Sequence, residues 1–199
     1  QIKKALIIAY WSAVLGDDGC VYCAPAEARR VLKVDPVANS VTLIGADFGS
    51  SFAQMKWRQG ALAGDNCLYF PPLHASQVLK VDPATEETSL IGNEFGKGLS
   101  SSWAGGCLAL DGRVYCPPWG GGRILCVDPE TQTTSLVGEA LGKLIFADFC
   151  ISRSGVLVAA PYDGGKLLCF DPSNATSKLI STGHEGVGTA FICTVSGVG

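Results

Sequence analysis

The feature that most constrains the fold is a residue pattern that occurs four times along the chain. Each copy opens with an aromatic residue, followed after nine residues by a hairpin residue, after six more by a proline, after ten more by an aspartate and after eight more by a leucine. The aromatic residues are Tyr10, Trp57, Trp103 and Phe146. The hairpin residues are Gly19, Asn66, Gly112 and Gly155. The prolines are Pro25, Pro72, Pro118 and Pro161, and the leucines are Leu43, Leu90, Leu136 and Leu179. Successive copies start 47, 46 and 43 residues apart, so the chain is a tandem repeat of one structural unit.

Each unit is predicted to contain four short β-strands. In the third copy they are WAGGCLAL, RVYCPP, GRILCVD and TTSLVG, which are rich in residues that favour pleated sheets. The dipeptide Asp111-Gly112 favours a tight hairpin, because glycine accepts the positive φ that such a turn needs. In the Asp-Pro turn the aspartate accepts backbone N–H groups and the proline presets φ, so these aspartates are predicted to be structural. They are Asp35, Asp82, Asp128 and Asp171.

Four antiparallel strands in a tandem unit of this length are typical of a β-propeller blade. A small sheet cannot bury both of its faces alone, whereas blades stacked about an axis bury them against each other. We therefore predict one all-β domain over residues 1–199, a β-propeller with four full four-stranded blades. The blades are placed at about 5–45, 46–92, 93–138 and 139–183, and residues 184–199 resemble the start of a fifth. The surplus unit favours a part of a larger propeller, and a closed four-bladed ring is the alternative.

The segment VLKVDPATEETSLIG resembles the strand–Asp-Pro–strand part of YVTN and quinoprotein-like propeller repeats. The wider pattern W-x-G-G…D-G-x-V-Y-C-x-P…V-D-P is similar to tandem repeats in large uncharacterised proteins of protists, dinoflagellates among them. The resemblance extends from about Tyr10 to Ser181. It implies the propeller architecture and does not imply an activity.

Composition and charge exclude several classes of partner. An apolar fraction of 47% and a charged fraction of 17% indicate a folded domain. The net charge of −3 without a basic cluster argues against nucleic acid. The N-terminal run KKALIIAYWSAVLG is shorter than the ~20 apolar residues of a membrane span. It has the outline of a secretory signal, but Tyr10 within it occupies a repeat position.

The nine cysteines do not indicate a metal site or a disulfide framework. Most share a repeat position with small or apolar residues, as buried free thiols do. Cys20 and Cys23 are three residues apart on a predicted strand, where they face opposite sides. We therefore expect no metal, no cofactor and reduced thiols, which favours the cytoplasm. The sequon Asn174-Ala175-Thr176 points instead to a secreted protein, although such residues are also common in turns.

No catalytic residues are predicted. The histidines His74 and His184 have no visible Ser/Asp or Cys partners, and the glycines of WGGGR lie between two strands rather than before a helix. The innermost strands show no set of acidic and amide side chains for an ion. An enzyme is disfavoured on these grounds, without being decided against.

The loops that follow each proline differ between units, whereas the Asp-Gly and Asp-Pro turns are nearly uniform. Scaffolds carry binding residues on loops, so the variable loop face is the predicted binding surface. The candidate residues are His74, Trp119, Tyr162 and Asp163, with Arg30 and Glu27 as weaker candidates. The favoured function is a non-catalytic scaffold that binds a protein or peptide. The alternatives are a lactonase- or quinoprotein-like enzyme acting at the central opening and a secreted carbohydrate-binding propeller. The oligomeric state is left open.

Overall fold

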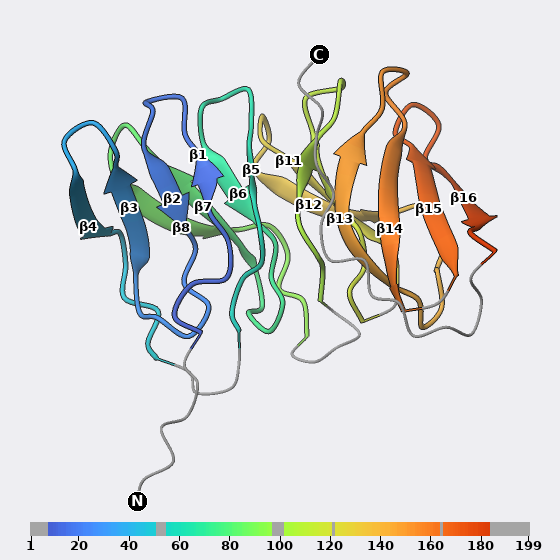
Figure 1. The fold of residues 1–199 in the computed structure, drawn as a ribbon, viewed down its shortest axis with the longest axis horizontal. Helices are drawn as coiled ribbons and strands as arrows, with labels where there is room; N and C mark the ends of the chain where they lie inside the picture. Colours follow the sequence, from blue (N-terminus) through green and yellow to red (C-terminus); the bar gives the residue numbers. More distant parts are fainter. Residues whose placement is uncertain (1–7, 51–54, 97–101, 121, 164, 184–199) are drawn as a thin grey trace, which may run out of the picture.

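The computed structural model describes residues 8–50, 55–96, 102–120, 122–163 and 165–183, and these residues form four four-stranded antiparallel sheets (Figure 1). The first sheet contains β1 (Val14–Leu15), β2 (Val21–Cys23), β3 (Val31–Asp35) and β4 (Ser40–Ile44). The second contains β5 (Ala61–Leu62), β6 (Leu68–Phe70), β7 (Val78–Asp82) and β8 (Glu87–Ile91). The third contains β9 (Cys107–Leu108), β10 (Val114–Cys116), β11 (Ile124–Asp128) and β12 (Thr133–Val137). The fourth contains β13 (Ile145–Ile151), β14 (Leu157–Asp163), β15 (Lys166–Asp171) and β16 (Thr176–Ser181).

Each sheet is a meander in sequence order, and the first strands β1, β5, β9 and β13 lie next to one another in succession. No α-helix occurs among the described residues. The predicted all-β propeller with four four-stranded blades is therefore confirmed. The predicted start of a fifth blade, residues 184–199, lies outside the described residues.

The aromatic residue and the proline of each unit are cross-strand partners. Three pairs are isolated bridges, and the fourth, Phe146 with Pro161, belongs to the β13–β14 ladder. The bridges are Tyr10 with Pro25, Trp57 with Pro72 and Trp103 with Pro118. The repeat spacing is therefore a pairing register, which fixes where the first two strands of every blade meet.

The first strand is shorter than predicted in the third blade. The segment WAGGCLAL forms only the bridge at Trp103 and the two-residue strand β9. Gly106 lies in the gap, and a Cβ there would come within 2.8 Å of the Val114 side chain. A glycine at such a close approach weakens the strand locally.

The Asp-Pro turns have the same geometry in all four blades. Asp35 Oδ1 accepts the backbone N–H groups of Val37 and Ala38 at 2.9 and 2.8 Å. Asp82, Asp128 and Asp171 accept the N–H two residues further on in the same way. The residue four positions after each aspartate has a positive φ, and these residues are Asn39, Glu86, Gln132 and Ala175. The Asp-Pro turns lie at the upper edge in Figure 1, which we call the turn face.

A second contact recurs at the turn face. A buried tyrosine on the second strand of each of the first three blades donates its hydroxyl proton to an aspartate in the preceding hairpin, over 2.7–2.8 Å. The pairs are Tyr22 with Asp18, Tyr69 with Asp65 and Tyr115 with Asp111. Burial, followed by this hydrogen bond, raises the pKa of each tyrosine. The fourth blade has Ser154 and Val158 at these two positions.

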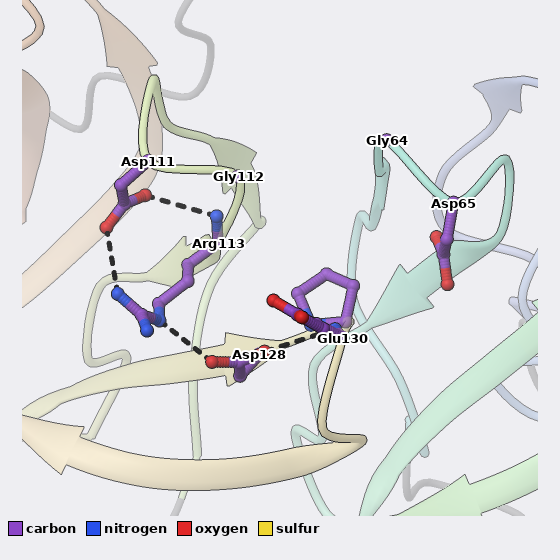
Figure 2. Close-up of a pocket in the computed structure, with 8 residues that line it drawn as sticks. Gly64, Asp65, Asp111, Gly112, Arg113, Asp128 and Glu130 are labelled. Carbon is purple, nitrogen blue, oxygen red and sulfur yellow. Dashed lines mark hydrogen bonds and ion pairs between the residues drawn. The ribbon is translucent and has the colours of Figure 1, made fainter.

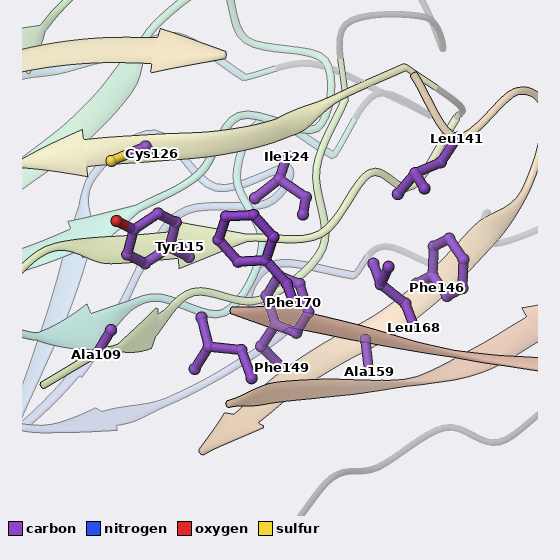
Figure 3. Close-up of a cluster of buried hydrophobic side chains, with 11 residues drawn as sticks. Ala109, Tyr115, Ile124, Cys126, Leu141, Phe146, Phe149, Ala159, Leu168 and Phe170 are labelled. Carbon is purple, nitrogen blue, oxygen red and sulfur yellow. The ribbon is translucent and has the colours of Figure 1, made fainter. Parts of the chain in front are cut away.

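Three apolar clusters fill the spaces between consecutive blades. One joins the first and second blades through residues such as Tyr22 and Phe70, and another joins the second and third through Tyr69 and Trp103. Figure 3 shows the cluster between the third and fourth blades, where the Tyr115 and Phe170 rings lie 5.3 Å apart. Alternate residues of each strand face the preceding and the following blade, as the two-residue period of a strand requires.

Candidate functional site

The turn face carries a groove between the second and third blades (Figure 2), with a volume of about 360 Å³. Its lining residues include Asp65, Asp111, Asp128 and Arg113. These carboxylates are already engaged, because Asp65 and Asp111 accept tyrosine hydroxyl protons and Asp128 binds Arg113 Nε at 3.0 Å. The turn N–H groups and then Arg113 lower the pKa of Asp128.

Similar grooves occur at the corresponding places between the other blades, lined by Asp17, Asp65 and Asp82 in one case and by Leu110, Ser154 and Asp171 in the other. The groove is therefore a consequence of the repeat. Among the described residues, no group of three or more His, Cys, Asp or Glu side chains is arranged to hold a metal ion.

The opposite face, formed by the loops after the second strands and by the blade connections, carries a continuous row of four large side chains. Trp11, Arg58, Trp119 and Tyr162 come from the first, second, third and fourth blades respectively. The Arg58 guanidinium lies 5.0 Å from the Trp11 ring centre and 4.1 Å from the Trp119 ring centre. The Trp119 and Tyr162 rings are 4.5 Å apart. We call these four side chains the arginine–aromatic row.

Two repeat positions supply this row. The residue after the opening aromatic is Trp11, Arg58, Ala104 or Ala147, and the residue after the proline is Ala26, Leu73, Trp119 or Tyr162. The first two blades therefore place a large side chain after the opening aromatic and a smaller one after the proline, and the last two blades do the reverse. In the antiparallel register set by the aromatic–proline bridges the two positions are diagonal neighbours on the same side of the strand pair, so the exchange keeps one large side chain per blade.

Arg58 is buried and forms no ion pair with another described residue. Only 7% of the residue is exposed, and its Nε has no hydrogen-bond partner among the described residues. Burial lowers the pKa of Arg58, while the charges of Asp148 and Tyr162 oppose that change. Among the described residues, Arg58 therefore contacts the Trp11 and Trp119 rings and is near the negative charge of Asp148.

Asp148 connects the row to a central cavity. The cavity has a volume of about 280 Å³ and is lined by the first strands of three blades, with Gln59 and Asp148 as polar members. Gly105 N–H donates to Asp148 Oδ1 at 2.6 Å, and a Cβ at Gly105 would lie 2.5 Å from this carboxylate. Burial raises the pKa of Asp148, and the Gly105 hydrogen bond and Arg58 act in the opposite direction.

Of the residues proposed from sequence, the structure brings Trp119 and Tyr162 together in the row. His74 Nδ1 lies 3.0 Å from the Met55 carbonyl oxygen, in a half-buried loop. The exposed Arg30 accepts a hydrogen bond from Tyr10 at its carbonyl oxygen, and Glu27 N–H donates to the Ile8 carbonyl.

The backbone of the remaining candidate, Asp163, ends β14 opposite Ile145. The described contacts of His74, Arg30 and Glu27 are with nearby segments of the same chain. None of these contacts is with the arginine–aromatic row.

Sequence reasoning missed Trp11, Arg58 and Asp148. It gave no role to the residues that follow the opening aromatics, and it found no set of acidic and amide side chains on the first strands. The available signal was the alignment of the four copies at the two positions after the aromatic. There Trp11 and Arg58 align with alanines, and Asp148 aligns with Ser12, Gln59 and Gly105.

The cysteines and the sequon at Asn174 were the other features singled out from the sequence. The eight cysteines among the described residues are free, and Cys107 has its pKa raised to about 11 by burial and then by Cys150. The Asn174 side chain donates to Asp171 Oδ2 and accepts from Thr176, so it is part of the fourth Asp-Pro turn. No helix in the described ranges is long and apolar enough to cross a membrane.

Known proteins resemble this chain in structure and not in sequence. No family model matches the chain, and no curated protein matches its sequence. The chain is similar to hydrazine synthase of Kuenenia stuttgartiensis, with a TM-score of 0.70, 16% identity, and coverage of 91% of this chain and 53% of that one. It is also similar to virginiamycin B lyase of Staphylococcus aureus, with a TM-score of 0.69, 10% identity, and coverage of 87% and 55%.

A third similar structure is the extracellular domain of a putative one-component system from Bacteroides thetaiotaomicron, with a TM-score of 0.64, 12% identity, and coverage of 90% and 23%. The chain thus spans about half the length of the synthase and of the lyase. At these identities the likeness shows the propeller fold alone.

Proposed function

We propose that this chain is a non-catalytic propeller scaffold that binds a protein or peptide through its loop face, with the arginine–aromatic row at the centre of the binding surface. The observation that carries the proposal is that each of four blades contributes one large side chain to one continuous row. The repeat does not require these side chains, because other blades have alanine at the same positions.

The composition of the row supports recognition of a protein or peptide. Trp, Tyr and Arg are the residues most enriched among those that dominate binding energy at interfaces. Trp11 is 44% exposed and Tyr162 is 36% exposed, so ring surface is accessible at both ends of the row. A rigid scaffold that presents varied loop residues is a common arrangement for binding.

A selection from random displayed peptides tests this function. The wild-type protein is expected to enrich related peptides, and a Trp119→Ala/Tyr162→Ala double variant is expected to lose them. Asp82→Ala is the matched control, because it changes a turn-face residue and should leave the selected peptides bound. Enriched peptides that bind the double variant as well as the wild type would contradict the proposed surface.

A second candidate is a lactonase- or quinoprotein-like enzyme acting in the central cavity. Asp148 favours it, because a carboxyl whose pKa burial raises can serve as a general acid or base. Assays with ester and lactone substrates would support this candidate if activity disappeared in Asp148→Asn. The carbohydrate-binding alternative rests on the exposed Trp11 and Tyr162 rings, which could stack on sugars, and a glycan array tests it directly.

We further propose that the chain is part of a larger propeller related to the YVTN, quinoprotein-like and protist repeats. On the first blade Leu32 and Val34 are half-buried, whereas the corresponding Leu79 and Val81 of the second blade are fully buried. A neighbouring blade would cover this apolar face. The free cysteines agree with a cytoplasmic location, which is likewise a proposal.

A further inference from the structure

The arginine–aromatic row contains a buried cation with an unsatisfied hydrogen-bond donor. A guanidinium carries five N–H donors and no acceptor. In Arg58 this group lies over the Trp11 and Trp119 rings, and the buried Nε donates to nothing in the described ranges. An unsatisfied buried donor costs about 1–3 kcal/mol, and more when the group is charged. None of the ion pairs among the described residues includes Arg58.

Lys56 shows that the fold can satisfy a buried cation nearby. It lies two residues before Arg58 and is 8% exposed. Its Nζ donates to the Ala28 and Gly49 carbonyl oxygens at 2.7 and 3.0 Å, which ties the second blade to the first. Lys56 therefore has a structural role that accounts for its burial. The contacts of Arg58 give no such account, since apart from the charge of Asp148 they are contacts with ring faces.

Resting on the proposed function, we propose that Arg58 is a specificity-determining residue that receives a carboxylate of the bound peptide. The planar guanidinium pairs with a carboxylate through two parallel N–H···O bonds, and such charge-assisted bonds are among the strongest in proteins. The Trp11 and Trp119 rings pack against the guanidinium, so its position is restricted before the ligand arrives. The accessible rings of Trp11 and Tyr162 would then contact apolar side chains beside the carboxylate.

The charge of the site favours a single negative group. Arg58 is one cation, the Asp148 carboxylate acts on it from nearby, and the whole chain has a net charge of −3. A phosphate, with nearly two negative charges, is usually held by several cations or by a nest of backbone N–H groups. A carboxylate of a peptide comes either from an Asp or Glu side chain or from the chain end, and the same pairing recognises both.

Three synthetic peptides separate these sources. The first is acetyl-Gly-Leu-Phe-Glu-Leu-Gly-amide, the second replaces Glu by Gln, and the third is the Gln peptide with a free carboxyl end. Binding is measured by calorimetry and by quenching of tryptophan fluorescence. The amidated Gln peptide is expected to bind about 10- to 100-fold more weakly than at least one of the carboxylate peptides. Which of the two binds better identifies the source of the carboxylate.

Variants complete the test. Arg58→Met should remove the preference for a carboxylate, and Arg58→Lys should keep a weaker preference because it retains the charge but not the planar fork. Arg113→Met, which removes an arginine from the turn face, should bind all three peptides like the wild type. Thermal melts of each variant confirm that it is folded.

Equal binding of all three peptides would overturn the assignment to Arg58, as would failure of both carboxylate peptides to bind at millimolar concentration. The proposed function is judged separately by the random-peptide selection. Selected peptides that need the row but contain no required carboxylate would retain the proposed function and reject this inference.

Discussion

The turn face and the loop face of this propeller are built from the same repeat, but the repeat is uniform at the turn face and varied at the loop face. At the turn face, tyrosine–aspartate contacts recur in three blades and aspartate turns recur in four. At the loop face, equivalent positions hold Trp, Arg or Ala in one case and Ala, Leu, Trp or Tyr in the other. The uniform contacts hold each sheet in shape, and the varied positions are free to carry recognition.

The two faces also differ in how their charged side chains are partnered. Turn-face groups such as Asp65, Asp128 and Arg113 have hydrogen-bond or ion-pair partners within the fold. At the loop face, Arg58 is buried with an unpartnered Nε. Buried polar groups in native proteins are usually satisfied, and an exception calls for a specific explanation. The contrast teaches that the better candidate for a site is the face where the repeat is broken, even though the grooves between blades lie at the turn face.

The largest effect is expected in the core that both faces share. Phe70 is fully buried between the first and second blades, so Phe70→Ala should lower the free energy of unfolding by about 3–5 kcal/mol. Chemical denaturation measures the change. Leu110→Ala is the control, because Leu110 is 79% exposed and its loss should change stability by less than about 0.5 kcal/mol. A loss below that level for Phe70→Ala would contradict packing between these blades.

A smaller loss of stability is expected when the buried cation Lys56 is replaced. Lys56→Met removes two charge-assisted hydrogen bonds to backbone carbonyls and should lower the free energy of unfolding by about 2 kcal/mol. The exposed Lys143→Met provides the control for loss of a positive charge. If Lys56→Met behaves like this control, the Nζ bonds do not join the first two blades.

The fold could be predicted because its main determinants are local and repeated. Each aromatic–proline spacing is a pairing register, and each Asp-Pro turn is formed by residues within a few positions of each other. The gap in the first strand of the third blade was not predicted. The same gap occurs in the first two blades, and the first has Ala13 where the third has Gly106, so no single residue type in the sequence signals it.

The candidate site could be predicted only in part. Trp119 and Tyr162 stood out as large residues on variable loops, but Arg58 follows the repeated aromatic Trp57, where the sequence suggested no role. Its contact with Trp119 joins residues that are far apart in sequence and lie on different blades. Neither periodicity nor turn chemistry carries information on such a contact. Comparing equivalent positions across the four copies is the step that would have exposed it.

The repeated tyrosine contact should have a moderate and pH-dependent effect. Tyr69→Phe removes the bond to Asp65 and should lower the free energy of unfolding by about 1–1.5 kcal/mol near neutral pH. Because folding raises the pKa of Tyr22, Tyr69 and Tyr115 above 10, the fold favours their neutral forms. This stabilisation is complete below about pH 10 and is lost as the pH rises through the folded-state pKa values.

Denaturation curves collected from neutral to alkaline pH measure this effect. The wild type should lose stability steeply above pH 10, and Tyr69→Phe should show a shallower loss because one of the three groups no longer titrates. The matched control is Tyr162→Phe, which changes an exposed tyrosine of the loop face. Identical slopes for Tyr69→Phe and the wild type would show that the turn-face tyrosines are not coupled to folding.

The smallest expected effect separates the two faces most directly. Arg58→Met replaces a buried guanidinium that has an unpartnered Nε with an apolar side chain of similar length. The variant loses cation–π contacts worth about 0.5–2 kcal/mol, but it also avoids the cost of burying an incompletely satisfied charge, which is of the same size or larger. We therefore expect the free energy of unfolding to stay equal or to rise by up to about 1 kcal/mol, measured under the conditions used for Lys56→Met. If Lys56→Met lowers the free energy of unfolding and Arg58→Met does not, Lys56 is part of the framework and Arg58 is a residue kept for binding. A loss as large as that of Lys56→Met would instead show that Arg58 holds the blades together, and the distinction between the two faces would then have to rest on Trp119 and Tyr162 alone.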